Sequence, residues 1–570
     1  MVKCNKNNQM PKIFSQTPSK ERTKRADIVT ETISATHRGI LSGIDEYKGA
    51  WGKKQATHLL RRTMFGATKT DINIMAAKTM SQAVDFLFLP QAKPAQPIND
   101  YNNIGDDKKL VDKIVPAGQP YADLPNRDID TEFWKNVSLK CWWFNNIIEQ
   151  KISIHEKMMF FWSNHVPVQI FEVYEARFGY RYLEVLRRNS TGNFKTLMRE
   201  ITTDPAMLRF LNGDKNSKFA PDENYGRELQ ELFCIGKGPN SKYTEDDVKT
   251  AARVLTGWKV DWTKSVSTFN ANDHDSGDKT FSSFYNNKVI KGQTGANGAK
   301  EVDDLLDMIF GNAECALHLV RKLYRFFVYH SIDAATETNV IAPLAQLLRT
   351  SNFDIKPVLL KLLKSEHFYD VLNLGVILKT PLDFAIGLLR EFNIPNPPKN
   401  NPREVLWVRM GMYWWLRDML LDIGDPPNVA GWPAWYQSPQ FDKYWITTNT
   451  LPKRGNLTDM MIYWGYENED KSIKYGINEF EFTKSLSNPS DPNALISEVI
   501  ELFFSIDVDA TVRKNLKNIL LSDQASDYYW TNAWNDYLAD PKNVMKQDVV
   551  KWRLKSFYQH IMQMEEYQMM

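Results

Sequence analysis

The sequence has few cysteines and no long apolar run. Its 570 residues include only Cys4, Cys141, Cys234 and Cys315, which lie far apart and lack the paired spacing of a metal site or a disulfide framework. No apolar run of about 7–15 residues marks a signal peptide near the N-terminus, and no run reaches the ~20 residues of a membrane helix. We therefore expect a soluble, cytoplasmic protein without a membrane span, with export by another route left open.

An excess of charge of one sign is also missing. The 71 basic and 69 acidic residues leave a formal net charge of +2. Proteins that bind nucleic acid usually present a clustered basic face, so this balance argues against a nucleic-acid partner. Several catalytic motifs are absent too: there is no phosphate-binding loop ending in Lys-Ser/Thr, no dinucleotide fingerprint and no G-x-S-x-G elbow. Strands and helices do not alternate, which disfavours an α/β enzyme.

What the sequence does contain is a long succession of apolar stripes at helical spacing. They predict a mainly α-helical fold, one large assembly of roughly fifteen to twenty helices with long loops. Short β-like runs near residues 260–292 predict a small hairpin, made by Thr280–Tyr285 and Lys288–Ile290. Residues 90–128 are rich in proline and asparagine and predict a long loop, of a length that is often functional or disordered.

Composition divides the chain into three parts. Residues 1–48 are polar and locally basic without steady helical periodicity, which predicts a flexible tail that is dispensable for folding. Residues 49–470 hold the most distinctive segments and predict the main helical domain. Residues 471–570 predict a C-terminal helical segment packed on that domain.

The stretch of residues 221–258 predicts two short helices joined by a turn. The first has one apolar stripe and ends at Gly236, where the chain must turn left-handed. The second begins at Thr244, and Asp247 at its third position completes a capping-box pattern. It ends at Gly257, so the two helices form one αα unit.

One face of the first helix carries Asn224, Glu228 and Glu231, with Arg227 beside them. Two interpretations stay open for this face. It is solvated, with Arg227 pairing to Glu223 and Glu231 for roughly 0.2–0.5 kcal/mol per pair. Alternatively it is a carboxylate cluster at the edge of a pocket, where crowded carboxylates bind a cation or a proton.

Seven segments of the chain form a further pattern. Besides residues 221–258 they are HLLRRTMFG (58–66), FFWSNHV (160–166), TTDPAMLRFLNG (202–213), HDSGDKTF (274–281), VRKLYRFFV (320–328) and DPPNVAGWP (425–433). With these segments, which keep the family's order over about residues 50 to 455, the chain resembles the bacterial domain of unknown function 1800 family. It departs from the family at Ser163, Ser276 and Ala434–Trp435, where a His or Asn, a proline and a glycine pair are more usual.

The resemblance implies a mainly helical domain without an established activity. It also implies a partner, because proteins of this family are often encoded beside a second family similar to alkaline-phosphatase-type enzymes. A protein of that second family is therefore the partner that the resemblance suggests.

Histidines and carboxylates in these segments are the candidate catalytic residues. His165 follows a helix, where an imidazole complements the helix dipole or serves a site. His274 and Asp275 begin a polar loop that suits either a ligand or a self-bonded surface turn. Together with Glu228 and Glu231 they would supply the acid, base or metal-binding groups of a hydrolase or lyase. These residue types suit a divalent metal, although no strict ligand spacing supports one.

The candidate ligand-binding residues are Asn224, Arg227, Asp425, Asn428 and Trp432. The last three lie in a loop that its prolines prevent from being a regular helix. Aromatic residues in this loop suit an alternative function, a non-enzymatic binding or assembly protein that holds a partner protein or a glycan. A structural interpretation also stays open, in which the aromatic residues belong to the core and the polar segments fasten long loops onto it.

Overall fold

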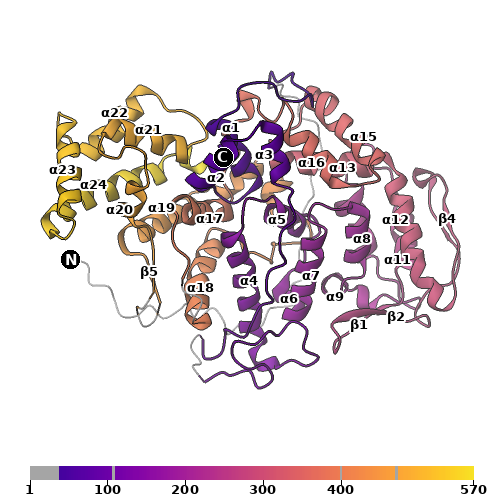
Figure 1. Ribbon diagram of the computed structural model, residues 1–570. Helices are drawn as coiled ribbons and strands as arrows, with labels where there is room; N and C mark the ends of the chain where they lie inside the picture. The colour runs from indigo at the N-terminus through magenta and orange to yellow at the C-terminus, as the bar shows by residue number, and fades with distance from the viewer. Residues whose placement is uncertain (1–37, 105–108, 398–400, 469–470, 472) are drawn as a thin grey trace.

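The computed structural model describes residues 38–104, 109–397, 401–468, 471 and 473–570 (Figure 1). Helices dominate this part of the chain, and its strands form three two-stranded antiparallel sheets. The mainly α-helical fold class predicted from the sequence is thereby confirmed. No helix in these residues combines the length and the apolar character needed to cross a membrane.

The N-terminal third builds the centre of the molecule. Several of its helices begin at side chains that accept from free backbone amides, such as the capping boxes of Thr68 with Asp71 and of Thr79 with Gln82. The helices are α1 (Lys53–Thr63), α2 (Lys69–Ala76), α3 (Met80–Phe86), α4 (Glu132–Glu149), α5 (His155–His165), α6 (Ile170–Val173), α7 (Ala176–Arg188), α8 (Phe194–Thr202) and α9 (Pro205–Phe210).

The middle of the chain adds the αα unit, the first two sheets and five further helices. The predicted hairpin is present only as the short pair of β3 with β4, because Ser283–Tyr285 of the predicted first strand form a 3-10 helix; β1 pairs with β2. The elements are α10 (Asn224–Glu228), a π-helix (Leu229–Cys234), α11 (Glu245–Val254), β1 (Trp258–Asp261), β2 (Val266–Phe269), β3 (Lys279–Thr280), β4 (Val289–Ile290), α12 (Glu301–Gly311), α13 (Ala313–Phe327), α14 (Ala334–Thr336), α15 (Ala342–Thr350) and α16 (Ile355–Leu363).

The last third contains α17 to α24, and α20 to α24 gather at one side of the molecule (Figure 1). Backbone bonds tie the end of the chain to the centre, because Lys379 donates to the Gln568 carbonyl and Met570 donates to the Ile377 carbonyl, both at 2.8 Å. The elements are α17 (Pro381–Glu391), α18 (Pro402–Asp418), α19 (Thr450–Asp459), β5 (Tyr466–Glu467), β6 (Lys474–Tyr475), α20 (Glu479–Lys484), α21 (Pro492–Phe503), α22 (Ala510–Leu521), α23 (Tyr528–Ala539) and α24 (Val544–Gln563).

One continuous apolar core joins these parts, since its buried side chains extend from Ala56 on α1 to Tyr567 near the end of the chain. Most of the predicted tail, residues 1–37, lies outside the described residues. The residues that follow, from Arg38, pack against the folded part of the protein. Ile40 is buried, and Arg38 donates to Asn373 at 2.9 Å and through its backbone amide to Asp333 at 3.1 Å. The globular part therefore begins about ten residues earlier than composition suggests.

Candidate functional site

The predicted carboxylate face lies on a helix that changes character part-way. α10 is α-helical to Glu228 and continues as a π-helix that contains Glu231. Both carboxylates are buried, and Glu231 forms an ion pair with Lys237. Arg227 pairs with Glu223 at 2.8 Å, as predicted, but its second partner is Glu245 on α11 at 2.6 Å. Arg227 thus fastens the αα unit together.

Two histidines from distant elements cap the π-helix. Nε2 of His165 lies 2.9 Å from the Phe233 carbonyl, and Nε2 of His318 lies 2.9 Å from the Leu232 carbonyl. Burial, followed by the charge of Lys322, holds the pKa of His165 well below its usual value, so its imidazole is neutral. The Nδ1 atom of His165 is buried and finds no hydrogen-bond partner among the described residues.

The predicted His274–Asp275 pair takes part in a different network. His274 is buried, with Nε2 3.1 Å from Oε1 of Glu301 and Nδ1 3.0 Å from the Thr256 carbonyl. The second oxygen of Glu301 accepts from Lys279 at 2.5 Å. Asp275 pairs with Arg253 on α11 at 2.7 Å. These contacts hold the loop against α11 and α12.

The three predicted ligand residues of the proline-bent loop also make contacts within the protein. Asp425 accepts from the Phe171 amide at 2.9 Å and forms an ion pair with Lys140, and burial raises its pKa to about 7. Asn428 accepts from the Ala430 amide at 2.8 Å. The ring of Trp432 is buried, and its backbone amide donates to Asn164 of α5 at 2.8 Å, so the loop is fastened to α4, α5 and α6.

The candidate residues from sequence therefore occupy three neighbourhoods. His165 touches the π-helix that carries Glu231, while Asn224 donates to the Leu211 carbonyl at 3.4 Å near the start of the same helix. His274 and Asp275 belong with α11 and α12. Within the described ranges, no group of three or more His, Cys, Asp or Glu side chains is placed to hold a metal ion.

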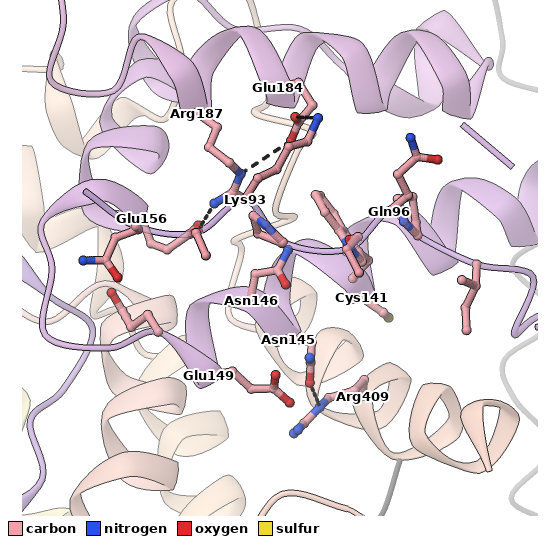
Figure 2. Close-up of a pocket in the computed structure, with 18 of the residues that line it drawn as sticks. Lys93, Gln96, Cys141, Asn145, Asn146, Glu149, Glu156, Glu184, Arg187 and Arg409 are labelled. Atoms are coloured by element: carbon pink, nitrogen blue, oxygen red, sulfur yellow. Dashed lines mark hydrogen bonds and ion pairs between the residues drawn. The ribbon is translucent and has the colours of Figure 1, made fainter. Parts of the chain in front are cut away.

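A cavity of 960 Å³ lies elsewhere, between residues 90–98 and the helices α4, α5, α7 and α18 (Figure 2). The proline-rich segment 90–98 forms one wall because Trp142 of α4 holds it: the indole N–H donates to the Ala95 carbonyl at 2.8 Å. α18 packs against α4 and closes the opposite side.

Carboxamide side chains are unusually frequent on the wall of this cavity. Two of them, Asn146 and Gln150, stand at the C-terminal end of α4 and contain buried atoms without a hydrogen-bond partner among the described residues: Nδ2 of Asn146 and both polar atoms of the Gln150 amide. Five such side chains line the cavity in all: Gln91, Gln96, Asn145, Asn146 and Gln150.

Ion pairs order one side of the cavity. Lys93 contacts Glu184 at 2.5 Å, and Arg187 pairs with Glu156 and, at 3.6 Å, with Glu184 (Figure 2). The guanidinium of Arg187 also lies 5.7 Å from the centre of the Trp142 ring. The polar groups on this side are consequently held in place before any ligand arrives.

Two further ionisable residues of the cavity wall, Arg409 and Asp100, have neutral hydrogen-bond partners. Arg409 of α18 is buried and donates to Asn145 at 3.0 Å, to Asn396 at 2.7 Å and to the Tyr475 hydroxyl at 2.9 Å. Asp100 lies on the wall and accepts from the Ser138 hydroxyl at 2.6 Å. Burial raises the pKa of Asp100 to about 7, because desolvation disfavours its charged form.

Residues 58–569, nearly the whole chain, match the model of a family described as a protein of unknown function, DUF1800. The chain belongs to the DUF1800 family. The resemblance carried by the seven sequence segments is thus confirmed. No curated protein and no solved structure matches the chain.

The cavity of this DUF1800 chain was missed by reasoning from the sequence. Asn145, Asn146 and Gln150 resemble an ordinary solvated helix end, and Arg409 lies over 250 residues further along the chain. One signal was present, because the predicted long loop of residues 90–128 begins with the segment that forms the cavity wall. Its three prolines limit the conformations of that wall.

Proposed function

We propose that this DUF1800 protein binds a glycan in the cavity between residues 90–98, α4 and α18. The observation that carries the proposal is the set of buried Asn146 and Gln150 amide atoms on the cavity wall that have no hydrogen-bond partner among the residues the structure describes. A buried polar atom left unpaired costs about 1–3 kcal/mol, which a ligand recovers by pairing with it. Carboxamides both donate and accept, and so do the hydroxyl groups of a sugar.

The size and the other lining residues support the same ligand class. A volume of 960 Å³ falls within the roughly 300–1,000 Å³ typical of small-molecule sites. Trp142 lines the cavity beside the amides, and an indole offers an apolar face to the C–H groups of a sugar ring. A binding protein for a glycan was one of the two functions that the sequence left open.

Isothermal titration calorimetry of the purified protein with a panel of neutral and acidic trisaccharides tests the proposal. We expect at least one member to bind, and Gln150→Ala to weaken that binding about tenfold, since one lost pairing is worth about 1–2 kcal/mol. Gln346→Ala, an exposed glutamine on α15, is the matched control and should leave the affinity unchanged. Binding that is indifferent to both substitutions would place the ligand elsewhere and refute the proposal.

A hydrolase or lyase acting at the carboxylate and histidine residues predicted from sequence is the second candidate. The π-helix that contains Glu231 favours it, because π-helical turns occur frequently at functional sites. Nδ1 of His165 beside that helix has no hydrogen-bond partner within the described ranges, which supports this candidate as well. Metal analysis, together with assays on ester, phosphate and glycoside substrates, tests this candidate. Glu228→Gln should then reduce ion binding or turnover with little loss of folding.

A partner protein similar to alkaline-phosphatase-type enzymes remains a prediction from the family resemblance. The cytoplasmic location likewise rests only on the sequence. Co-expression of this chain with such a protein, followed by affinity purification through either one, tests the first prediction. Recovery of both chains together in stoichiometric amounts is the expected result, and recovery of one alone contradicts it.

A further inference from the structure

Arg409 is a buried cation that pairs with no carboxylate in the described part of the chain. Only 2% of the residue is exposed, and its three hydrogen bonds go to the neutral acceptors Asn145, Asn396 and Tyr475. Among the described residues no carboxylate forms an ion pair with it. A guanidinium has five N–H groups, so these bonds leave two of them. A buried charge is costly unless it is paired, and Arg409 lines the cavity.

Counted with Arg409, the cavity wall carries one more basic side chain than carboxyl groups. Five basic side chains line it, namely Lys93, Lys151, Arg187, Arg188 and Arg409, against the four carboxyls Asp100, Glu149, Glu156 and Glu184. Glu156 and Glu184 are paired with Arg187 and Lys93, and Arg188 is paired with Glu200 outside the wall, which leaves Lys151 and Arg409 as the basic groups without an ion pair among the described residues. Lys151 is exposed on the cavity rim and forms no ion pair among the described residues. Such a wall attracts an anionic ligand.

We infer that the ligand is an acidic glycan whose anionic oxygens bind the Arg409 guanidinium at the α18 side of the cavity. This inference rests on the proposed glycan binding. The shared chemistry is that of a uronate carboxylate or a sulfate ester, either of which accepts the paired N–H groups of an arginine. Asn145, which accepts from Arg409, directly precedes Asn146 on α4, and Gln150 follows four residues after Asn146. With its acidic group on Arg409, the ligand is expected to pair its sugar hydroxyls with the amides of Asn146 and Gln150, which line the same cavity.

The Glu149 carboxylate weakens the preference of the cavity for an acidic glycan. It belongs to the same side of the cavity as Arg409 and Asn145 (Figure 2). A carboxylate there repels an anionic ligand and leaves a neutral one almost unaffected. Removal of its charge by Glu149→Gln is consequently expected to strengthen the binding of an acidic glycan selectively.

Three trimers of one backbone separate the alternatives: α-1,4-galactotriose, trigalacturonate, and the galactotriose carrying 6-sulfates. By titration calorimetry we expect an acidic trimer to bind at least about tenfold more tightly than galactotriose, as charge-assisted bonds imply. The difference should shrink as salt is raised from 50 to 500 mM, about the range over which screening becomes strong. The two acidic trimers distinguish carboxylate from sulfate as the preferred group.

Variants assign the preference to Arg409. Arg409→Gln should bring the acidic trimer to the affinity of galactotriose, while Arg417→Gln, on the same helix but paired with Asp422, should retain the preference. Circular dichroism checks folding, and if Arg409→Gln does not fold, Lys151→Gln decides by a loss of about threefold for the acidic trimer alone. Equal binding of all three trimers overturns this inference and leaves the proposed function standing, whereas no binding of any trimer refutes both.

Discussion

Asp100 has an acidity that differs from that of an exposed aspartate. Burial raises its pKa from 3.8 to about 7, and the bond from Ser138 offsets only part of that effect. The folded state therefore holds the Asp100 proton more tightly than the unfolded state. The stability linked to this group is present at about pH 4 and is lost as the pH rises through 7.

Asp100→Asn should remove that dependence. Relative to the wild type, the variant is expected to gain about 2–4 kcal/mol in free energy of unfolding between pH 4 and pH 8. Urea unfolding of both proteins at pH 4, 5, 6, 7 and 8 measures the difference. A difference that stays constant over this range would show that Asp100 titrates as an ordinary surface carboxyl.

The start of α11 depends on one capping box. The Thr244 hydroxyl accepts from the Asp247 amide at 3.2 Å, and Asp247 accepts from the Thr244 amide at 2.8 Å. Asp247 has a second role, since its carboxylate also accepts from the Ser282 amide and hydroxyl, each at 2.7 Å. It thus ties the segment after β3 to α11.

Thr244→Ala is expected to cost about 0.5–2 kcal/mol, the usual loss for an N-cap. Asp247→Ala should cost more, because it also removes the acceptor of the half-buried Ser282 amide and hydroxyl. Thermal and urea unfolding of the two variants show which substitution lowers the free energy of unfolding more. Equal losses would mean that the Ser282 contacts add nothing to stability.

The same elements explain what the sequence could predict. Gly236 and the Thr244–Asp247 cap depend on neighbours within a few residues, and the structure has both as predicted. The π-helix ends against His165 and His318, which are 68 and 86 residues from the carbonyls they contact. Helical spacing alone cannot reveal such a change, because the caps come from distant parts of the chain.

The end of the chain is expected to be part of the cooperative fold. Gln568 is buried and accepts from Arg454 at 3.1 Å, and Arg454 is fully buried too. Gln568→Ala should therefore cost about 1–3 kcal/mol, because it strands an N–H group of a buried charge. Gln563→Ala is the matched control: it removes an exposed bond to Asp459 and should change stability by less than about 0.5 kcal/mol. Similar small losses for both would show that the C-terminal residues fray freely.

At the scale of the whole molecule, the fold class and the family could be recognised from the sequence and the cavity could not. Its wall combines residues 90–98 with Arg409, so only the tertiary fold brings the polar groups together. The residues predicted as a site lie in the segments that resemble the family. Two of them are already bound within the protein, because His274 contacts Glu301 and Asp425 pairs with Lys140. Their catalytic role stays a prediction that Glu228→Gln tests.

Hydrogen–deuterium exchange with and without the tightest-binding trisaccharide of the panel tests the central claim most directly. Bound ligand should slow exchange in residues 90–98 and 145–155, because the first segment forms one wall of the cavity and the second carries the Asn146 and Gln150 amides. Residues 224–236 and 270–280 serve as internal references and should exchange at unchanged rates. Protection confined to those reference segments, with none at residues 90–98, would contradict the account and place the ligand at the π-helix instead.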